Sequence, residues 1–143
     1  MPCRVLLVDD NSDFRTVARQ LLERHGFLVV AEAETGIGGI EQAQEHRPDL
    51  VLLDVQLPDI DGFEVAERLA RLEVPVDVIL TSSLDGTDFG ALVAGSSALG
   101  FVPKAELSAS AIEALLPRRA DRAAAVCPGR GSRRHWRRRR RIP

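Results

Sequence analysis

The chain has 143 residues, of which 45% are hydrophobic and 28% charged, a length and composition typical of one globular domain. Its two cysteines lie near opposite ends and its three histidines have no metal-ligand spacing, which argues against a disulfide framework or a zinc site. No segment has the roughly 20 apolar residues of a membrane span, and no signal peptide is evident, so we expect a cytoplasmic protein without a membrane partner.

The formal net charge of −2 conceals two parts of opposite charge. Residues 1–117 carry 8 basic and 20 acidic side chains, a net charge of −12, whereas residues 118–143 carry 11 basic and 1 acidic, a net charge of +10. This division predicts a folded domain over 1–117 and an arginine-rich, disordered tail over 118–143 with no output domain.

Three interpretations of the tail stay open. It can bind nucleic-acid phosphates through its arginines, with Trp136 available for stacking on a base. It can fold back onto the acidic domain, which has the opposite charge. It can also be the translated product of a shifted or truncated gene that lost its output domain, because a chain with one lysine and many arginines is typical of GC-rich coding sequence. A nucleic-acid-binding regulator acting through the tail is therefore the alternative function.

Short apolar runs alternate with amphipathic segments along the first 117 residues. Continuous apolar runs suit strands buried on both faces, and apolar residues at a spacing of three or four suit helices. In chain order the sequence predicts a strand over 5–8, a helix over 14–22, a strand over 27–31, a helix from 35, a strand over 50–53, a helix over 63–72, a strand over 76–80, a helix over 87–94, a strand over 100–102 and a helix up to 116. Five strand–helix units predict a parallel sheet covered by helices on both faces.

Helix ends follow from local side-chain chemistry. Ser12 or Asp13 is expected to cap the first helix, and Gly26 stands where a left-handed residue ends it. Ser108 or Ser110 is expected to cap the last helix.

Polar residues follow four of the predicted strands. Asp9 and Asp10 follow the first strand, Asp54 the third, Thr81 the fourth and Lys104 the fifth. Because ligands of such folds bind outside the carboxyl ends of the strands, we expect these side chains to converge at one edge. Lys104 is the only lysine in the chain.

The acidic group is suited to a divalent cation. Three clustered carboxylates repel one another, and an all-oxygen set favours Mg²⁺, or Mn²⁺, with Asp10 and Asp54 as direct ligands and Asp9 acting through water. A carboxylate can also be a nucleophile that forms an aspartyl-phosphate. Lys104 would supply positive charge and Thr81 a hydroxyl donor to a phosphoryl group, so the constellation predicts phosphoryl transfer to Asp54.

These residues stand in stretches that resemble the receiver domains of two-component response regulators. The matching stretches are 5–10, 53–62, 80–82 and 100–104, within a resemblance over about residues 3–117. The second stretch is the most specific: an aspartate ends an apolar strand, a proline follows four residues later, and Asp-Gly follows at seven and eight. The resemblance implies a flavodoxin-like, doubly wound five-stranded parallel sheet of order 2-1-3-4-5.

The resemblance also implies roles for individual residues. Asp54 would be the phosphorylated residue, and Asp9, Asp10 and the backbone carbonyl of Gln56 would bind Mg²⁺ with it. Thr81 and Lys104 would contact the phosphoryl group, and Phe101 would be the aromatic switch residue that moves with Thr81. Residues 56 and 83 stand at the positions that tune phosphoryl lifetime in relatives.

The implied partners are a sensor histidine kinase or a phosphotransfer protein as donor, and a downstream protein target. The face formed by the fourth helix, the fifth strand and the fifth helix would bind the target or a second copy of the chain. Phosphorylation would act as a local charge event that biases two conformations. The chain would be a single-domain response regulator in a phosphorelay, and it would turn over no external substrate as an enzyme.

The sequence departs from the family pattern in two places. Ala105 follows the lysine where relatives usually carry a proline, and the segment after the fourth strand is rich in glycine and alanine, with low helix propensity. Two other site types fit poorly. Residues 36–39 lack the spacing of a phosphate-binding loop, and Gln56 stands where a haloacid-dehalogenase-like phosphatase would carry a second aspartate.

Overall fold

Five parallel strands form a single sheet at the centre of the described structure, in the order β2-β1-β3-β4-β5. The computed structural model describes residues 2–72, 76–83 and 90–116. The strands are β1 Arg4–Val8, β2 Leu28–Ala33, β3 Leu50–Asp54, β4 Asp77–Ser82 and β5 Gly100–Pro103. The strand order and the parallel pairing confirm the predicted flavodoxin-like fold.

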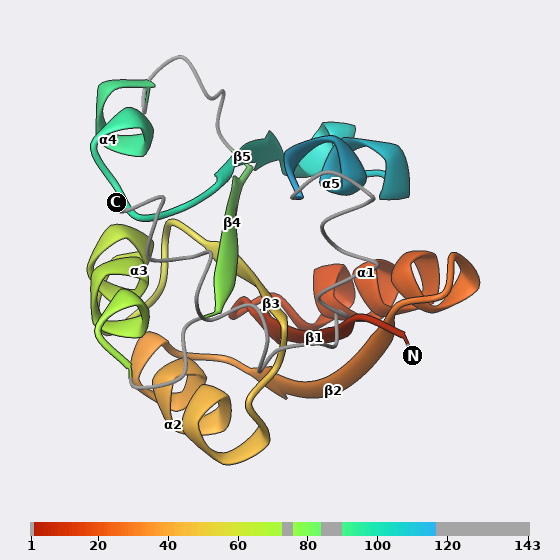
Figure 1. Ribbon diagram of the computed structural model, residues 1–143, viewed down its shortest axis with the longest axis horizontal. Helices are drawn as coiled ribbons and strands as arrows, with labels where there is room; N and C mark the ends of the chain where they lie inside the picture. Colours follow the sequence, from red (N-terminus) through yellow and green to blue (C-terminus); the bar gives the residue numbers. More distant parts are fainter. Residues whose placement is uncertain (1, 73–75, 84–89, 117–143) are drawn as a thin grey trace, which may run out of the picture.

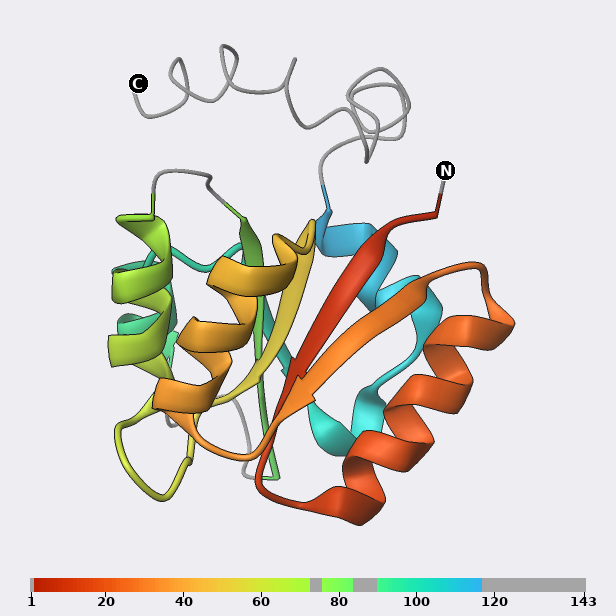
Figure 2. The ribbon, with the colours of Figure 1, turned by 90° about the horizontal axis from the view of Figure 1, so that it is seen from below.

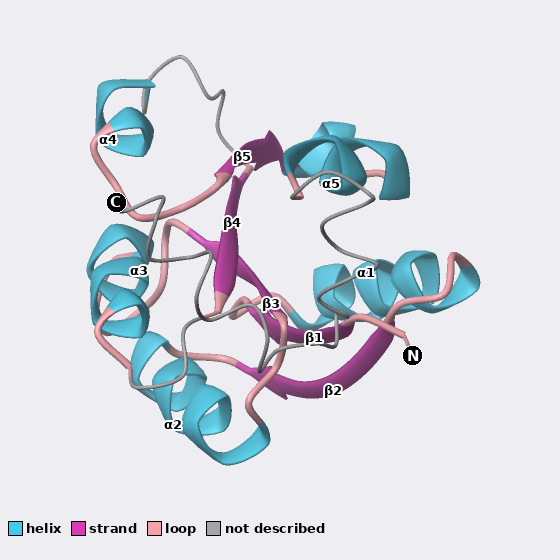
Figure 3. Cartoon of the chain, viewed as in Figure 1, coloured by secondary structure: helices cyan, strands magenta, loops and turns pink. Residues whose placement is uncertain are grey.

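Helices cover both faces of the sheet, and a short 3₁₀ turn, Lys104–Glu106, follows β5 (Figure 3). The helices are α1 Ser12–Arg24, α2 Gly36–His46, α3 Gly62–Ala70, α4 Gly90–Ala94 and α5 Ala109–Leu115. α1 and α5 lie on one face, and α2, α3 and α4 lie on the other (Figures 1 and 2). This division follows from the right-handed crossovers between parallel strands.

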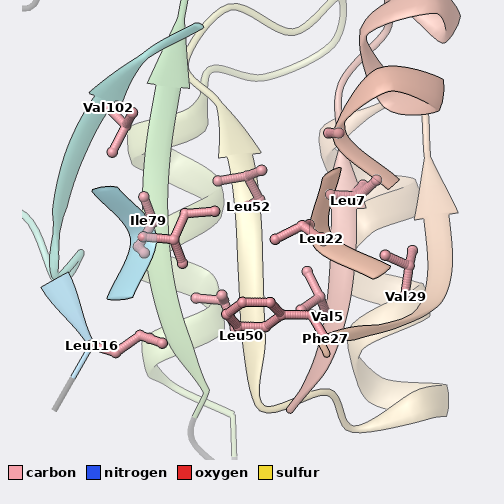
Figure 4. Packing of buried hydrophobic residues seen from close by; sticks show 12 residues of the cluster. Val5, Leu7, Leu22, Phe27, Val29, Leu50, Leu52, Ile79, Val102 and Leu116 are labelled. Atoms are coloured by element: carbon pink, nitrogen blue, oxygen red, sulfur yellow. The ribbon is translucent and has the colours of Figure 1, made fainter. Parts of the chain in front are cut away.

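The two faces of the sheet carry separate apolar cores. Because successive strand residues point to opposite faces, Val5 and Leu7 of β1 join the core under α1 and α5, whereas Leu6 and Val8 join the core under α2, α3 and α4. Figure 4 shows the first core, in which Leu22 of α1 packs against the strands. The central strands are therefore apolar on both sides, as the continuous runs in the sequence predict.

Several predicted boundaries need correction. The cap of α1 is Asn11, not Ser12 or Asp13, because the Asn11 Oδ1 atom accepts the amide N–H groups of Asp13 and Phe14 at 2.9 and 3.1 Å. β2 and β4 each begin one residue later than predicted and end two residues later, because their pairing with neighbouring strands continues to Ala33 and Ser82.

Other local predictions agree with the structure. Gly26 follows α1 with a φ of +92°, a conformation that favours glycine. Ser108, one of the two predicted caps, receives the amide N–H of Ala111 at 3.0 Å. The first part of the predicted helix over 87–94 and the whole predicted tail over 118–143 lie outside the described residues, so the boundary of the folded domain stays a prediction. Within the described residues no helix has the length and apolar character needed to cross a bilayer.

Candidate functional site

Three carboxylates meet at the carboxyl end of the sheet. β1 and β3 are neighbours, with Val8 paired to Leu53, so the residues that follow these two positions come together. Asp9 and Asp54 are 2% and 4% exposed, whereas Asp10 is exposed. One oxygen atom from each of the three carboxylates lies within 4.8 Å of the others. The structure thus brings together the acidic residues that the sequence predicts.

The turn after β1 is fixed by groups that the sequence reading missed. The amide N–H of Asn11 donates to Asp9 Oδ1 at 2.8 Å, and the Arg15 guanidinium donates to the Asp9 carbonyl oxygen. Glu32 of β2 binds Arg15 Nε at 2.8 Å and also pairs with Arg19. Burial acts to raise the pKa of Glu32, but the two guanidinium groups outweigh it, and the pKa lies below its ordinary value. The ion pair of Arg15 with Glu32 therefore supports the backbone that carries Asp9 and Asp10.

Lys104 reaches the acidic group from the end of β5. Its Nζ atom lies 2.7 Å from Asp9 Oδ2 and 3.3 Å from Asp54 Oδ2, and its side chain is 16% exposed. Nζ also lies over the ring of Phe14, 4.6 Å from the ring centroid. Burial alone would lower the pKa of Lys104, but the Asp9 and Asp54 carboxylates outweigh it and hold that pKa above its ordinary value. The ammonium is therefore charged and held between the two buried carboxylates.

Asp54 occupies an environment that disfavours its charge. Burial raises its pKa above the ordinary value, and the nearby Asp9 carboxylate adds to that increase. The Gln56 amide N–H, which donates to Asp54 Oδ1 at 3.0 Å, and the Lys104 ammonium oppose the increase without cancelling it. A buried carboxylate with incomplete compensation attracts a cation, which makes Asp54 the centre of the site.

Thr81 lies beside Asp54 on the neighbouring strand. The two residues are paired in the β3–β4 register, Thr81 is 1% exposed, and its carbonyl oxygen accepts the Val55 N–H at 2.9 Å. Phe101 is half-buried on β5, paired with Leu80, and packs against the core under α2, α3 and α4. Both residues stand where the sequence places them, and their switch roles stay predictions.

The loop between β3 and α3 is held by close backbone contacts. A Cβ atom on Gly62 would lie 2.5 Å from the Asp54 carbonyl oxygen and 2.7 Å from the Val55 Cα atom, so only glycine fits this approach. The Gly62 N–H donates to the Val55 carbonyl oxygen at 2.7 Å. Asp61 caps α3 by accepting the Glu64 N–H at 2.9 Å. The Asp-Gly pair of the sequence motif therefore folds the loop back onto the end of β3.

Asp59 joins the same loop to a different helix. Its two carboxylate oxygens accept the amide N–H groups of Gly36 and Ile37, at the start of α2, at 2.7 and 2.9 Å. The Ile37 N–H contributes most to holding the pKa of Asp59 below its ordinary value. The sequence reading missed this contact, because the partners are 22 and 23 residues away and no local pattern links them.

The donor set fits a hard divalent cation. Asp9, Asp10 and Asp54 offer only oxygen atoms, and the buried Asp9 Oδ2 atom lies 2.7 Å from the Lys104 ammonium. Gln56, the fourth predicted ligand through its carbonyl, follows Asp54 by two residues. A cluster of carboxylate oxygens suits Mg²⁺, which binds one or two carboxylates and keeps several waters.

Comparison with known proteins identifies the family of the chain. The family model "Response regulator receiver domain" matches residues 5–116. The BvgA virulence-factor transcription regulator of Bordetella pertussis is 39% identical over 103 residues, which cover 72% of this chain and 49% of BvgA. The chemotaxis protein CheY of Bacillus subtilis is 36% identical over 84 residues, which cover 59% of this chain and 70% of CheY.

Solved structures give the same result. The receiver domain of NarL from Mycobacterium tuberculosis superposes with a TM-score of 0.72 and 30% identity, covering 82% of this chain and 98% of that one. A LuxR-family response regulator from Aurantimonas sp. SI85-9A1 superposes with a TM-score of 0.72 and 31% identity, covering 80% and 85%. The chain spans about half the length of the first curated relatives it matches. From its sequence, fold and site together, the chain belongs to the response regulator receiver domain family.

Proposed function

We propose that the chain is a phosphoacceptor in two-component signalling and that Asp54 is the residue phosphorylated. The observation that carries the proposal is the position of the Lys104 ammonium between Asp9 and Asp54, with Asp10 within metal-binding reach of both carboxylates. This arrangement joins a carboxylate nucleophile to the positive charge that a phosphoryl group requires.

Each residue would have a defined part in the transfer. An Asp54 oxygen attacks phosphorus, the bond from phosphorus to the donor histidine nitrogen breaks, and the imidazole leaves with that electron pair. Lys104 stays beside the phosphoryl oxygens, and the Thr81 hydroxyl, on the adjacent strand, donates to one of them. The buried setting strengthens these contacts because little water competes for them. The donor would be a sensor histidine kinase or a phosphotransfer protein.

Asp9, Asp10, Asp54 and the Gln56 carbonyl would hold Mg²⁺ or Mn²⁺. When bound, the cation neutralises negative charge on the carboxylates and on the phosphoryl oxygens. The short distances between the carboxylate oxygens of Asp9, Asp10 and Asp54 support this set.

The face built by α4, β5 and α5 would carry the signal to a downstream protein, or to a second copy of the chain. Two large apolar side chains are exposed there, Leu92 at 57% and Leu99 at 36%. Phe101 lies on β5, the strand that leads to Lys104, and β5 is paired with β4, which carries Thr81. Movement of Thr81 would therefore be passed to this face through β4 and β5. The chain would act by changing partner affinity, and its own chemistry would be limited to gaining and losing the phosphoryl group.

The direct test is incubation with acetyl phosphate and Mg²⁺, followed by intact-protein mass spectrometry. We expect the chain to gain one phosphoryl group, the Asp54→Asn variant to gain none, and the Asp13→Asn variant, altered at an exposed acid of α1, to behave as the parent. Removing Mg²⁺ with a chelator should prevent the gain. A parent that stays unmodified, or an Asp54→Asn variant that is modified equally, would refute the proposal.

A further inference from the structure

The ammonium of Lys104 has three close neighbours of two kinds. Two are the carboxylates of Asp9 and Asp54, at 2.7 and 3.3 Å. The third is the ring of Phe14, whose centroid lies 4.6 Å from Nζ. An ammonium within about 6 Å of an aromatic face is attracted by the negative potential of that face, and the attraction grows where water is excluded. The ring is therefore a genuine partner of the ammonium.

The three contacts would respond differently once a cation and a phosphoryl group occupy the site. If the proposed function is correct, a cation binds Asp9 and Asp54, and phosphorylation uses the free carboxylate of Asp54. Both carboxylates then have a competing partner of higher charge than Lys104. The ring of Phe14 carries no charge, takes no part in metal binding and keeps its place. Of the three contacts, the one with the ring would therefore stay available to the ammonium after the cation and the phosphoryl group have bound.

Phe14 is fixed in place by the same turn that carries the acidic pair. Its amide N–H donates to the Asn11 side chain at 3.1 Å, and the Asn11 amide N–H in turn donates to Asp9 Oδ1 at 2.8 Å. The ring side chain packs against the core under α1 and α5. A ring held at both its backbone and its side chain has little freedom to move away from Lys104.

We propose that Phe14 is a positioning residue for phosphoryl transfer, whose ring face holds the Lys104 ammonium toward the phosphoryl group when the carboxylates are occupied. The inference rests on the proposed function of Asp54. It concerns a residue outside the set of carboxylates, hydroxyl and ammonium that the sequence predicts. The ring would affect the transfer step and not the affinity for the cation, because it touches none of the cation's ligands in the described contacts.

The first test replaces Phe14 by leucine, which keeps apolar bulk without an aromatic face, and by tyrosine, which keeps the face. At saturating Mg²⁺ and acetyl phosphate, we expect Phe14→Leu to lower the phosphorylation rate about three- to tenfold. Phe14→Tyr should stay within about twofold of the parent. The Mg²⁺ dissociation constant, measured by calorimetry on the unphosphorylated chain, should be the same in all three proteins.

A second series guards against a folding defect in the leucine variant. Phenylalanines bearing one, two and three ring fluorines, introduced at position 14 by codon suppression, weaken the negative face while nearly preserving ring size. We expect the rate to fall stepwise along the series while the unfolding midpoint and the Mg²⁺ affinity stay constant. The same series at Phe27, a buried ring of the same core, is the matched control and should leave the rate unchanged.

The outcomes separate the inference from the proposed function. A flat rate at position 14, an equal decline at position 27, or a Mg²⁺ affinity that falls in step with the rate would overturn the role of Phe14 while Asp54 phosphorylation stands. A parent chain that gains no phosphoryl group at Asp54 would overturn both.

Discussion

At the scale of single residues, Asp54 is the clearest case of a side chain whose charge is unfavourable in the folded protein. It is 4% exposed, and burial together with Asp9 raises its pKa. The folded protein therefore binds the Asp54 proton more tightly than the unfolded chain does. Ionisation of Asp54 consequently lowers the free energy of unfolding as the pH rises above the ordinary pKa of 3.8, and this loss is complete above the raised pKa.

The Asp54→Asn variant should therefore be more stable than the parent at pH 7 in the presence of a chelator. We expect the gain in unfolding free energy to be about 0.5–2 kcal/mol, the size of a typical single stabilising substitution. The gain should shrink toward pH 3.5, where the parent carboxyl is protonated. Urea denaturation of both proteins across this pH range measures it. An Asp54→Asn variant that is less stable than the parent at pH 7 would contradict this account of the site.

At the scale of elements, the loop between β3 and α3 is connected to α2 by one carboxylate. Asp59 accepts two amide N–H groups at the start of α2, where the helix dipole also favours negative charge. Because the pKa of Asp59 is held below its ordinary value of 3.8, folding favours its charged form. The resulting stabilisation is complete above the unfolded pKa and is lost as the pH falls through the lower folded pKa.

The Asp59→Asn variant should therefore unfold at a lower urea concentration than the parent at pH 7, and the difference should decrease as the pH falls below 4. The Glu41→Gln variant removes the same charge from an exposed position on α2 and should show a smaller change. Equal urea midpoints for Asp59→Asn and the parent at pH 7 would show that this contact does not stabilise the loop.

A feature of the structure could be predicted from the sequence where its cause lies in neighbouring residues. The apolar runs of β1 and β3 and the aspartates that end them follow from neighbouring residues, so the sheet and the acidic group could be predicted from the sequence. The cap at Asn11 was missed because three successive residues, from Asn11 to Asp13, are all good caps, and only the hydrogen bonds decide among them. The contacts of Asp59 with α2 and of Lys104 with Phe14 join distant segments, and no local pattern encodes them.

At the scale of the whole molecule, the site exists only when β1, β3, β4 and β5 are assembled, since each contributes one part of it. A cation that binds the assembled site and not the unfolded chain must stabilise the entire fold by mass action. Mg²⁺ at ten times its dissociation constant should raise the unfolding free energy by about 1.4 kcal/mol.

The effect should depend on the acidic group. Asp10→Asn leaves the two buried carboxylates in place and removes an exposed one, so it should fold normally and lose most of the stabilisation by Mg²⁺. Urea denaturation with and without Mg²⁺ measures the difference, and NaCl at equal ionic strength controls for screening. An equal response to Mg²⁺ in Asp10→Asn and the parent would exclude Asp10 from the metal site.

Because the chain has a single lysine, the chemical reactivity of that lysine reports on the state of the site. Apart from the α-amino group, Lys104 Nζ is the one primary amine in the chain, and it lies against two carboxylates with its side chain 16% exposed. With a limiting amount of an acylating reagent, the fraction of Lys104 that is acylated would depend on how often Nζ separates from the two carboxylates. One peptide in a digest would then show, without any substitution in the chain, whether ions and phosphate donors have changed the contacts of this amine.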